Sequence, residues 1–251
     1  MLIDTHAHVN YLKDPDNEIR EAYDADVKKL IVPTANPFDF EPVMKLCGEY
    51  DGVYGALGVH PSDIDKYSSD AMNKIIELSK NEKIIAVGEI GLDYYWDSEN
   101  IDKEAQKKIF KAQLDLANVL DLPVIIHDRE AHLDTLNILR EMGNKRVVMH
   151  CFSGSVEFMK ECVNLGFYIA LGGVVTFKNA KKVKEVAFNV PLNNLLLETD
   201  CPYLAPHPFR GEENSPKYLP FIAHEIANIK DITYDEVAQF TNKNVSQLFN
   251  I

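Results

Sequence analysis

Six side chains that can bind a metal ion follow directly on apolar stretches of this sequence. The stretches are short and rich in valine, isoleucine and leucine, which is typical of buried β-strands. Imidazole and carboxylate groups suit Zn²⁺, Mn²⁺, Fe²⁺ or Ni²⁺, whereas Ca²⁺ prefers oxygen ligands alone. Ligands gathered from the ends of several strands indicate a metal-dependent hydrolase. The six side chains are His6, His8, Glu89, His127, His150 and Asp200.

The motif at the start of the chain pairs two of these histidines. In a strand, residues two apart share one face, so His6 and His8 would present both imidazoles to one point. The alternative is two polar residues at a solvated strand end. Asp4 lies on the same face and is expected to accept a hydrogen bond that orients a histidine.

A carboxylate follows the apolar run IIAVG. Burying Glu89 there without a partner would be costly, so it either bridges two cations or is a solvated charge paired with Arg129 or Lys103. Asp93 and Tyr94 follow in what is expected to be a loop, from which they would contact substrate.

Three further residues complete the predicted ligand set. His127 and His150 each end a strand-like run. Two histidines at equivalent positions favour a shared metal site over the alternative, in which each is a core residue that makes hydrogen bonds within the protein. Asp200 is the last predicted ligand and the predicted general base, while Glu198 is either its partner or a structural acid.

The predicted ligand set is large enough for two divalent ions, drawn from Zn²⁺, Mn²⁺, Mg²⁺, Fe²⁺ or Ni²⁺. Two ions roughly 3.5–4 Å apart would lower the pKa of a water between them, and this water would act as the nucleophile. The second ion would stabilise charge on a phosphoryl or carbonyl oxygen.

Strand and helix patterns alternate along the whole chain. Because eight repeated βα units favour closure, the pattern predicts an α/β protein, a single-domain (β/α)8 TIM-type barrel over residues 1–251. A doubly wound open sheet is the alternative, but a glycine-rich loop would usually follow its first strand. Helices are expected at 103–120, 133–142, 155–165, 179–187, 216–229 and 234–249. Strands are expected at 2–6, 28–33, 53–58, 84–89, 123–127, 146–150, 167–172 and 194–198.

Composition limits the possible partners. With 46% hydrophobic and 26% charged residues the chain is typical of a globular enzyme, and its net charge of -13 disfavours a broad DNA-coating surface. No membrane segment and no obligate protein partner are expected. The four cysteines form no CxxC pair and are predicted to be reduced thiols, so a cytoplasmic location is expected.

Several motifs, spread over most of the chain in one order, carry a specific resemblance. The chain resembles the TatD-type deoxyribonucleases, which are metal-dependent barrels of the amidohydrolase-like group. The matching strings are DTHAH, GALGVHP, VGEIGLDYY, IHDREAHLDTL, HCFSGS, ETDCPYLAPHPFRGEENSP and TNKNVSQLF.

This resemblance implies roles for individual residues. It puts His6, His8, Glu89 and Asp200 on one metal ion, and Glu89, His127 and His150 on the other. It also implies substrate binding by His60, Arg129 and Arg210. A guanidinium can bind a phosphate with two parallel hydrogen bonds, and the alternative for either arginine is an ion pair with a nearby acid.

Family members are described as metal-dependent nucleases, some of which degrade single-stranded DNA from the 3′ end. DNA or a nucleotide is therefore the expected substrate. Asp128, Glu130 and Glu212 depart from the usual family pattern and make the rim of the site more acidic.

Three functions are compatible with these residues. The first is a deoxyribonuclease, in which Asp200 takes the proton of the attacking water and an arginine holds a neighbouring phosphate. The second is an amidohydrolase or esterase acting on a small carbonyl substrate or an aminoacyl ester. The third is a non-catalytic metal-binding scaffold, which would need a closed coordination shell.

Overall fold

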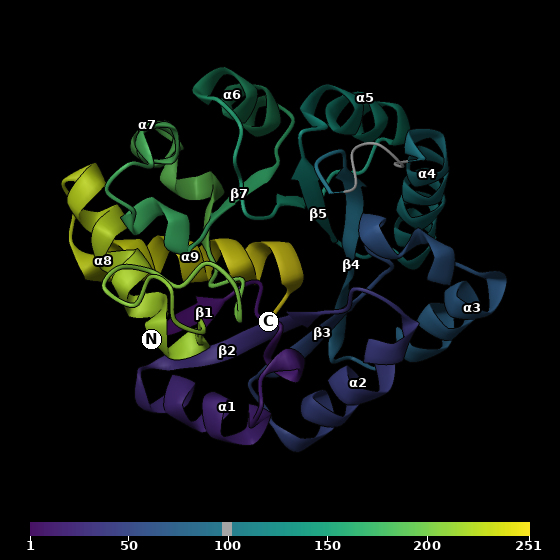
Figure 1. Ribbon diagram of the computed structural model, residues 1–251, viewed down its shortest axis with the longest axis horizontal. Coiled ribbons are helices and arrows are strands. Elements are labelled where there is room, and N and C mark those ends of the chain that lie inside the picture. The colour runs from purple at the N-terminus through teal and green to yellow at the C-terminus, as the bar shows by residue number, and fades with distance from the viewer. Residues whose placement is uncertain (97–101) are drawn as a thin grey trace. The chain divides into compact units, whose positions relative to one another are not determined.

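The computed structural model describes residues 1–96 and 102–251. Eight strands form one sheet in which neighbours follow chain order from β1 to β8, and helices alternate with them along the chain (Figure 1). This is the topology of a (β/α)8 barrel, so the predicted fold class is confirmed. The strands are β1 (Leu2–Asp4), β2 (Val27–Pro33), β3 (Val53–Leu57), β4 (Ile84–Asp93), β5 (Val124–Arg129), β6 (Val147–Met149), β7 (Tyr168–Leu171) and β8 (Leu195–Leu197).

Several helices begin at a residue whose side chain accepts a hydrogen bond from a backbone N–H of the first turn. The Asp102 side chain accepts from the N–H of Ala105, and Thr233 and Glu236 form a reciprocal capping box. All six predicted helices are confirmed to within a few residues. The helices are α1 (Pro15–Asp24), α2 (Phe40–Glu49), α3 (Ser69–Leu78), α4 (Lys103–Leu120), α5 (His132–Met142), α6 (Val156–Asn164), α7 (Lys181–Asn189), α8 (Leu219–Lys230) and α9 (Tyr234–Phe249).

The chain forms two compact units. The first unit comprises Met1–Val32 and Cys151–Ile251, and the second unit comprises Pro33–His150. In the first unit, β1 pairs with β2 and β7 pairs with β8, all in parallel. Helix α9 packs against β1 and β8, the two strands that precede His6, His8 and Asp200 in the chain.

In the second unit, strands β3 to β6 pair successively in parallel. Every residue of β4 is buried, as expected for a parallel strand covered on both faces. Helix α4 packs against β4 and against α5 (Figure 1). The core beneath α2 and α3 contains Phe40, Leu57, Ile75 and Ile84.

Most predicted strand boundaries lie within two residues of those in the structure, and two of the differences bear on the predicted ligands. The strand expected at 2–6 ends at Asp4, because beyond it the backbone is tied by the Asp4 carboxylate. The strand expected to end at Glu89 continues to Asp93, since its last residues pair with β5 as far as Arg129. Asp93 therefore ends a strand and does not lie in a loop.

Within the part of the chain that the structure describes, no helix is both long enough and apolar enough to span a bilayer. No disulfide joins the cysteines in these residues.

Candidate metal centre

A buried carboxylate fixes the backbone on which the first unit carries its predicted ligands. Asp4 Oδ1 accepts from the N–H of His6 at 3.2 Å and of Thr199 at 2.9 Å, and Thr199 Oγ1 donates to Asp4 Oδ2 at 2.6 Å. Asp4 therefore holds the main chain beside the predicted ligands His6 and Asp200. The sequence predicted instead that it would accept a hydrogen bond from a histidine ring. Burial raises the pKa of Asp4 to about 8, although the Thr199 hydrogen bonds oppose this shift.

Three donor atoms converge in the first unit, which we call the first cluster: His6, His8 and Asp200. The Nε2 atoms of His6 and His8 are 3.1 Å apart. Asp200 Oδ1 lies 3.8 Å from His6 Nε2 and 3.9 Å from His8 Nε2. Tetrahedral ligands about 2.1 Å from an ion lie about 3.4 Å from one another. The first cluster therefore fits one divalent ion with small adjustments.

The backbone around Asp200 is set by its neighbours. Its N–H donates to the carbonyl of His6 at 2.8 Å, and its φ of 57° lies in the left-handed region, where aspartate is one of the tolerated residues. The ring of His8 stacks on Tyr11, with centroids 5.3 Å apart, which restrains the imidazole. Two segments distant in sequence thus hold the donors together.

In the second unit, three imidazoles gather around one carboxylate, and we call these four side chains the second cluster: His60, Glu89, His127 and His150. Glu89 Oε1 lies 2.8 Å from Nδ1 of His127, 3.3 Å from Nε2 of His150 and 3.6 Å from Nε2 of His60. Glu89 is only 4% exposed. A carboxylate buried among imidazoles is a suitable ligand set for a divalent transition-metal ion.

His127 is oriented through its other ring nitrogen. Its Nε2 lies 2.9 Å from Asp93 Oδ2, so one imidazole joins the carboxylates of Glu89 and Asp93. Burial alone would lower the pKa of His127, but hydrogen bonds to Asp93 and Glu89 outweigh it and raise the pKa to about 9. This carboxylate–imidazole arrangement is the one that fixes metal-binding histidines in proteins.

Close contact between β4 and β5 makes this arrangement possible. Gly91 pairs with His127 and has a φ of +147°, and a Cβ there would lie 1.9 Å from the carbonyl oxygen of His127. Only glycine fits this position. The two strands can therefore approach closely where they carry Glu89, Asp93 and His127.

The predicted substrate residues have different surroundings. His60 joins the second cluster, and its ring lies edge-on to that of His127, with centroids 4.3 Å apart. The Arg129 guanidinium lies over the ring of Tyr95, whereas the exposed Arg210 lies over Phe177. Substrate binding by these residues stays a prediction.

Comparison with known proteins identifies the family. The family described as TatD related DNase matches residues 3–250. The chain belongs to this TatD-related family. It is 44% identical to the uncharacterized metal-dependent hydrolase YabD of Bacillus subtilis over 256 residues, which cover all of both chains. It is 38% identical to the uncharacterized metal-dependent hydrolase YcfH of Escherichia coli, covering 100% of this chain and 96% of that protein.

Solved structures agree with this relationship. The TatD homologue YjjV of Escherichia coli matches with a TM-score of 0.94 and 34% identity, over 100% of this chain and 98% of that chain. An organophosphorus hydrolase from Deinococcus radiodurans matches 99% of this chain and 92% of its own, with a TM-score of 0.64 and 16% identity, which shows a shared fold alone. As a TatD-family member, the chain is a metal-dependent hydrolase.

Two acids of this TatD-related chain have contacts that the sequence left open. Glu198, predicted as a partner of Asp200 or a structural acid, accepts from the backbone N–H of Cys151 at 2.6 Å. Asp128, one of the unusual acids, pairs with Nδ1 of His132 at 2.8 Å. Both acids therefore have structural partners outside the predicted ligand set.

The role of Asp93 and the contact between Asp4 and Thr199 were missed at the level of sequence. Asp93 lies four residues after Glu89 on the same strand, so side-chain alternation would have put both on one face if the strand had been extended. The contact between Asp4 and Thr199 joins residues 195 apart, and no local pattern predicts it.

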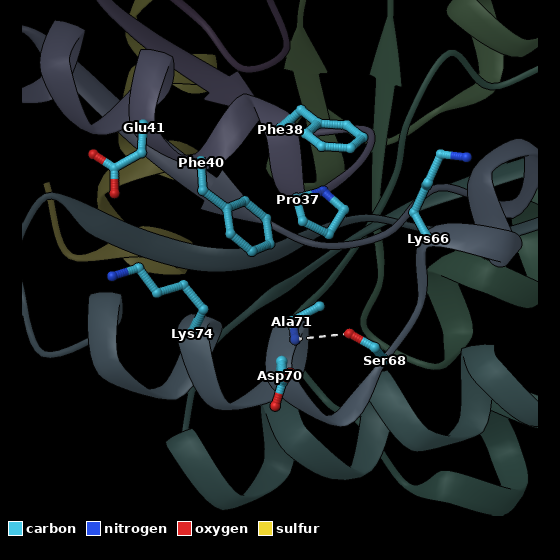
Figure 2. Close-up of a pocket in the computed structure, with 9 residues that line it drawn as sticks. All are labelled: Pro37, Phe38, Phe40, Glu41, Lys66, Ser68, Asp70, Ala71 and Lys74. Carbon is cyan, nitrogen blue, oxygen red and sulfur yellow. Dashed lines mark hydrogen bonds between the residues drawn. The ribbon is translucent and has the colours of Figure 1, made fainter.

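The second unit also has a surface pocket of about 330 Å³ (Figure 2). Its lining comes from two segments and consists of Pro37, Phe38, Phe40, Glu41, Lys66, Ser68, Asp70, Ala71 and Lys74. None of the described lining residues belongs to either cluster. This pocket therefore carries no predicted metal ligand.

Proposed function

We propose that the chain is a deoxyribonuclease that hydrolyses phosphodiester bonds and shortens DNA from the 3′ end. One observation carries the proposal: His127 and Arg129 lie two residues apart at the carboxyl end of β5. Residues two apart on a strand share a face, so a predicted metal ligand and a guanidinium stand side by side. A guanidinium recognises phosphate with paired hydrogen bonds, and the family's description as DNases supports the same chemistry.

We propose that each cluster holds one divalent ion. In (β/α)8 enzymes the reacting groups come from the carboxyl-terminal halves of several strands and the loops after them. Glu89 and His127 lie in the second halves of β4 and β5, and the other residues of the two clusters follow strands. As the family resemblance implies, His6, His8 and Asp200 would hold one ion, His127 and His150 would hold a second, and Glu89 would be a ligand of both. Bound divalent ions would supply charge neutralisation at the phosphoryl oxygens and a more acidic water.

Asp200 is the proposed general base. Its side chain is 13% exposed, whereas that of His6 is fully buried, so the carboxylate is the more accessible of the two groups to an attacking water. In the proposed step Asp200 accepts the proton of that water while Arg129 holds a neighbouring phosphate. The buried imidazoles keep bulk solvent away from the developing charge.

The test uses 5′-labelled single-stranded DNA with Mg²⁺, Mn²⁺ or Zn²⁺, and a chelator control. A metal-dependent ladder of shortened products is expected from the wild-type protein and not from Asp200→Asn. Intact DNA under every condition, in protein whose metal content has been verified, would contradict the proposal.

A carbonyl substrate is the second candidate. The same water chemistry suits an amide or ester, and the net charge of -13 favours a less anionic substrate than DNA. Profiling small esters, amides and aminoacyl esters at matched metal loading separates this candidate from the first.

A further inference from the structure

Two large aromatic side chains stand exposed directly after β4. Tyr95 is 53% exposed and Trp96 is 60% exposed. Their rings meet nearly at right angles, 84°, with centroids 5.5 Å apart. Neighbouring exposed aromatic residues of this size commonly mark a binding surface, because leaving them in water is unfavourable.

The main chain of this pair is fixed by the residue that orients His127. Asp93 Oδ1 accepts from the N–H of Tyr95 at 2.8 Å and of Trp96 at 3.1 Å, while Oδ2 of the same carboxylate lies 2.9 Å from His127 Nε2. The neighbouring Tyr94 is held as well, since its hydroxyl donates to Asp134 at 2.8 Å. The carboxylate of Asp93 therefore fixes both the backbone of Tyr95 and Trp96 and the imidazole of His127.

A guanidinium completes the surface. The Cζ atom of Arg129 lies 4.0 Å from the ring centroid of Tyr95 and 5.0 Å from that of Trp96. More than half of each aromatic side chain stays exposed despite this contact. Aromatic faces beside a positive charge are how proteins bind unpaired nucleotides, because the base stacks and the phosphate pairs with the cation.

We propose that Tyr95, Trp96 and Arg129 form a subsite that stacks one unpaired base of single-stranded nucleic acid and binds its phosphate. The inference rests on the proposed phosphodiesterase function, since it concerns the substrate of that site. A base held in a duplex has both faces stacked and does not fit, so the subsite selects frayed or single-stranded ends.

Trp96 is the sole tryptophan of the chain, so its fluorescence reports directly on this subsite. The probe is a nuclease-resistant phosphorothioate oligothymidylate, compared with an abasic phosphorothioate strand of equal length. We expect saturable quenching by the oligothymidylate and none by the abasic strand. Equal quenching by both strands would overturn the proposal, because it would show that the phosphates alone are bound.

A second experiment measures how tightly variants bind a labelled oligothymidylate, using its fluorescence anisotropy. Tyr95→Ala and Trp96→Ala should each weaken binding about 5- to 150-fold, the range for losing one base–aromatic stack. Phe188→Ala is the matched control, because Phe188 is 65% exposed near the end of α7 and should not matter. Wild-type affinity in both aromatic variants would overturn the proposal.

Cleavage of unmodified single-stranded DNA by the same protein preparations separates the subsite from the nuclease activity. DNA cleavage without base-dependent quenching would overturn the subsite and leave the nuclease proposal intact. Base-dependent quenching without any cleavage would support the subsite and contradict the nuclease proposal.

Discussion

Replacing Asp93 with asparagine changes the protonation of His127 with almost no change in shape. Asp93 Oδ1 accepts from two backbone N–H groups, so the amide oxygen of asparagine is expected to stay there. The amide NH₂ then faces His127 Nε2, which lies 2.9 Å from Oδ2 in the native protein. Two donors cannot share this contact, so His127 must carry its proton on Nδ1.

That proton is on the wrong nitrogen for metal binding. Nδ1 of His127 lies 2.8 Å from Glu89 Oε1, so it is the atom that faces the second cluster. A protonated Nδ1 has no lone pair to offer an ion. Loss of such an orienting carboxylate typically lowers metal affinity 10- to 100-fold, or about 1.4–2.7 kcal/mol.

The assay is competition between the protein and a chelating dye for Zn²⁺ or Mn²⁺. Asp128→Asn is the matched control, because Asp128 also pairs with an imidazole, that of His132 at 2.8 Å, outside the predicted ligand set. Asp93→Asn should lose affinity and Asp128→Asn should not. Equal loss in both variants, or unchanged affinity in Asp93→Asn, would refute the assignment of Asp93.

Further variants test the backbone, the buried carboxylate and the substrate contact. Gly91→Ala forces a Cβ to 1.9 Å from the carbonyl oxygen of His127 and should lower the free energy of unfolding by about 3 kcal/mol or more. Gly48 is exposed in α2 with open space around it, so Gly48→Ala should raise the free energy of unfolding by up to about 1 kcal/mol. Urea denaturation measures both, and similar effects would contradict the argument from close strand approach. Thr199→Val removes the hydroxyl that donates to Asp4 and should cost about 2 kcal/mol in the same experiment, with no change as the contrary result. Arg129→Ala should weaken nucleotide binding about 10-fold or more and leave metal affinity unchanged in calorimetry, and equal loss of both would refute a role in phosphate binding.

The fold, and the gathering of most of the predicted ligands into clusters, could be predicted from sequence because both depend on local patterns. The run IIAVGEIGLD shows a buried parallel strand, and the histidines at 127 and 150 stand where such runs end. Placing Glu89 at the end of its strand was wrong, since pairing with the next strand continues the element to Asp93.

Contacts between distant segments could not be predicted in the same way. His6 and His8 were expected to converge as strand residues, yet the strand ends at Asp4 and their proximity depends on how the backbone continues beyond it. That backbone is fixed by Thr199, whose partnership with Asp4 joins opposite ends of the sequence. Local periodicity carries no information about such a contact.

Anomalous X-ray diffraction from crystals grown with Mn²⁺ tests the proposed centre most directly. We predict two anomalous peaks, one contacting His6, His8 and Asp200 and one contacting Glu89, His127 and His150. A single peak, or peaks that contact neither cluster, would contradict this prediction.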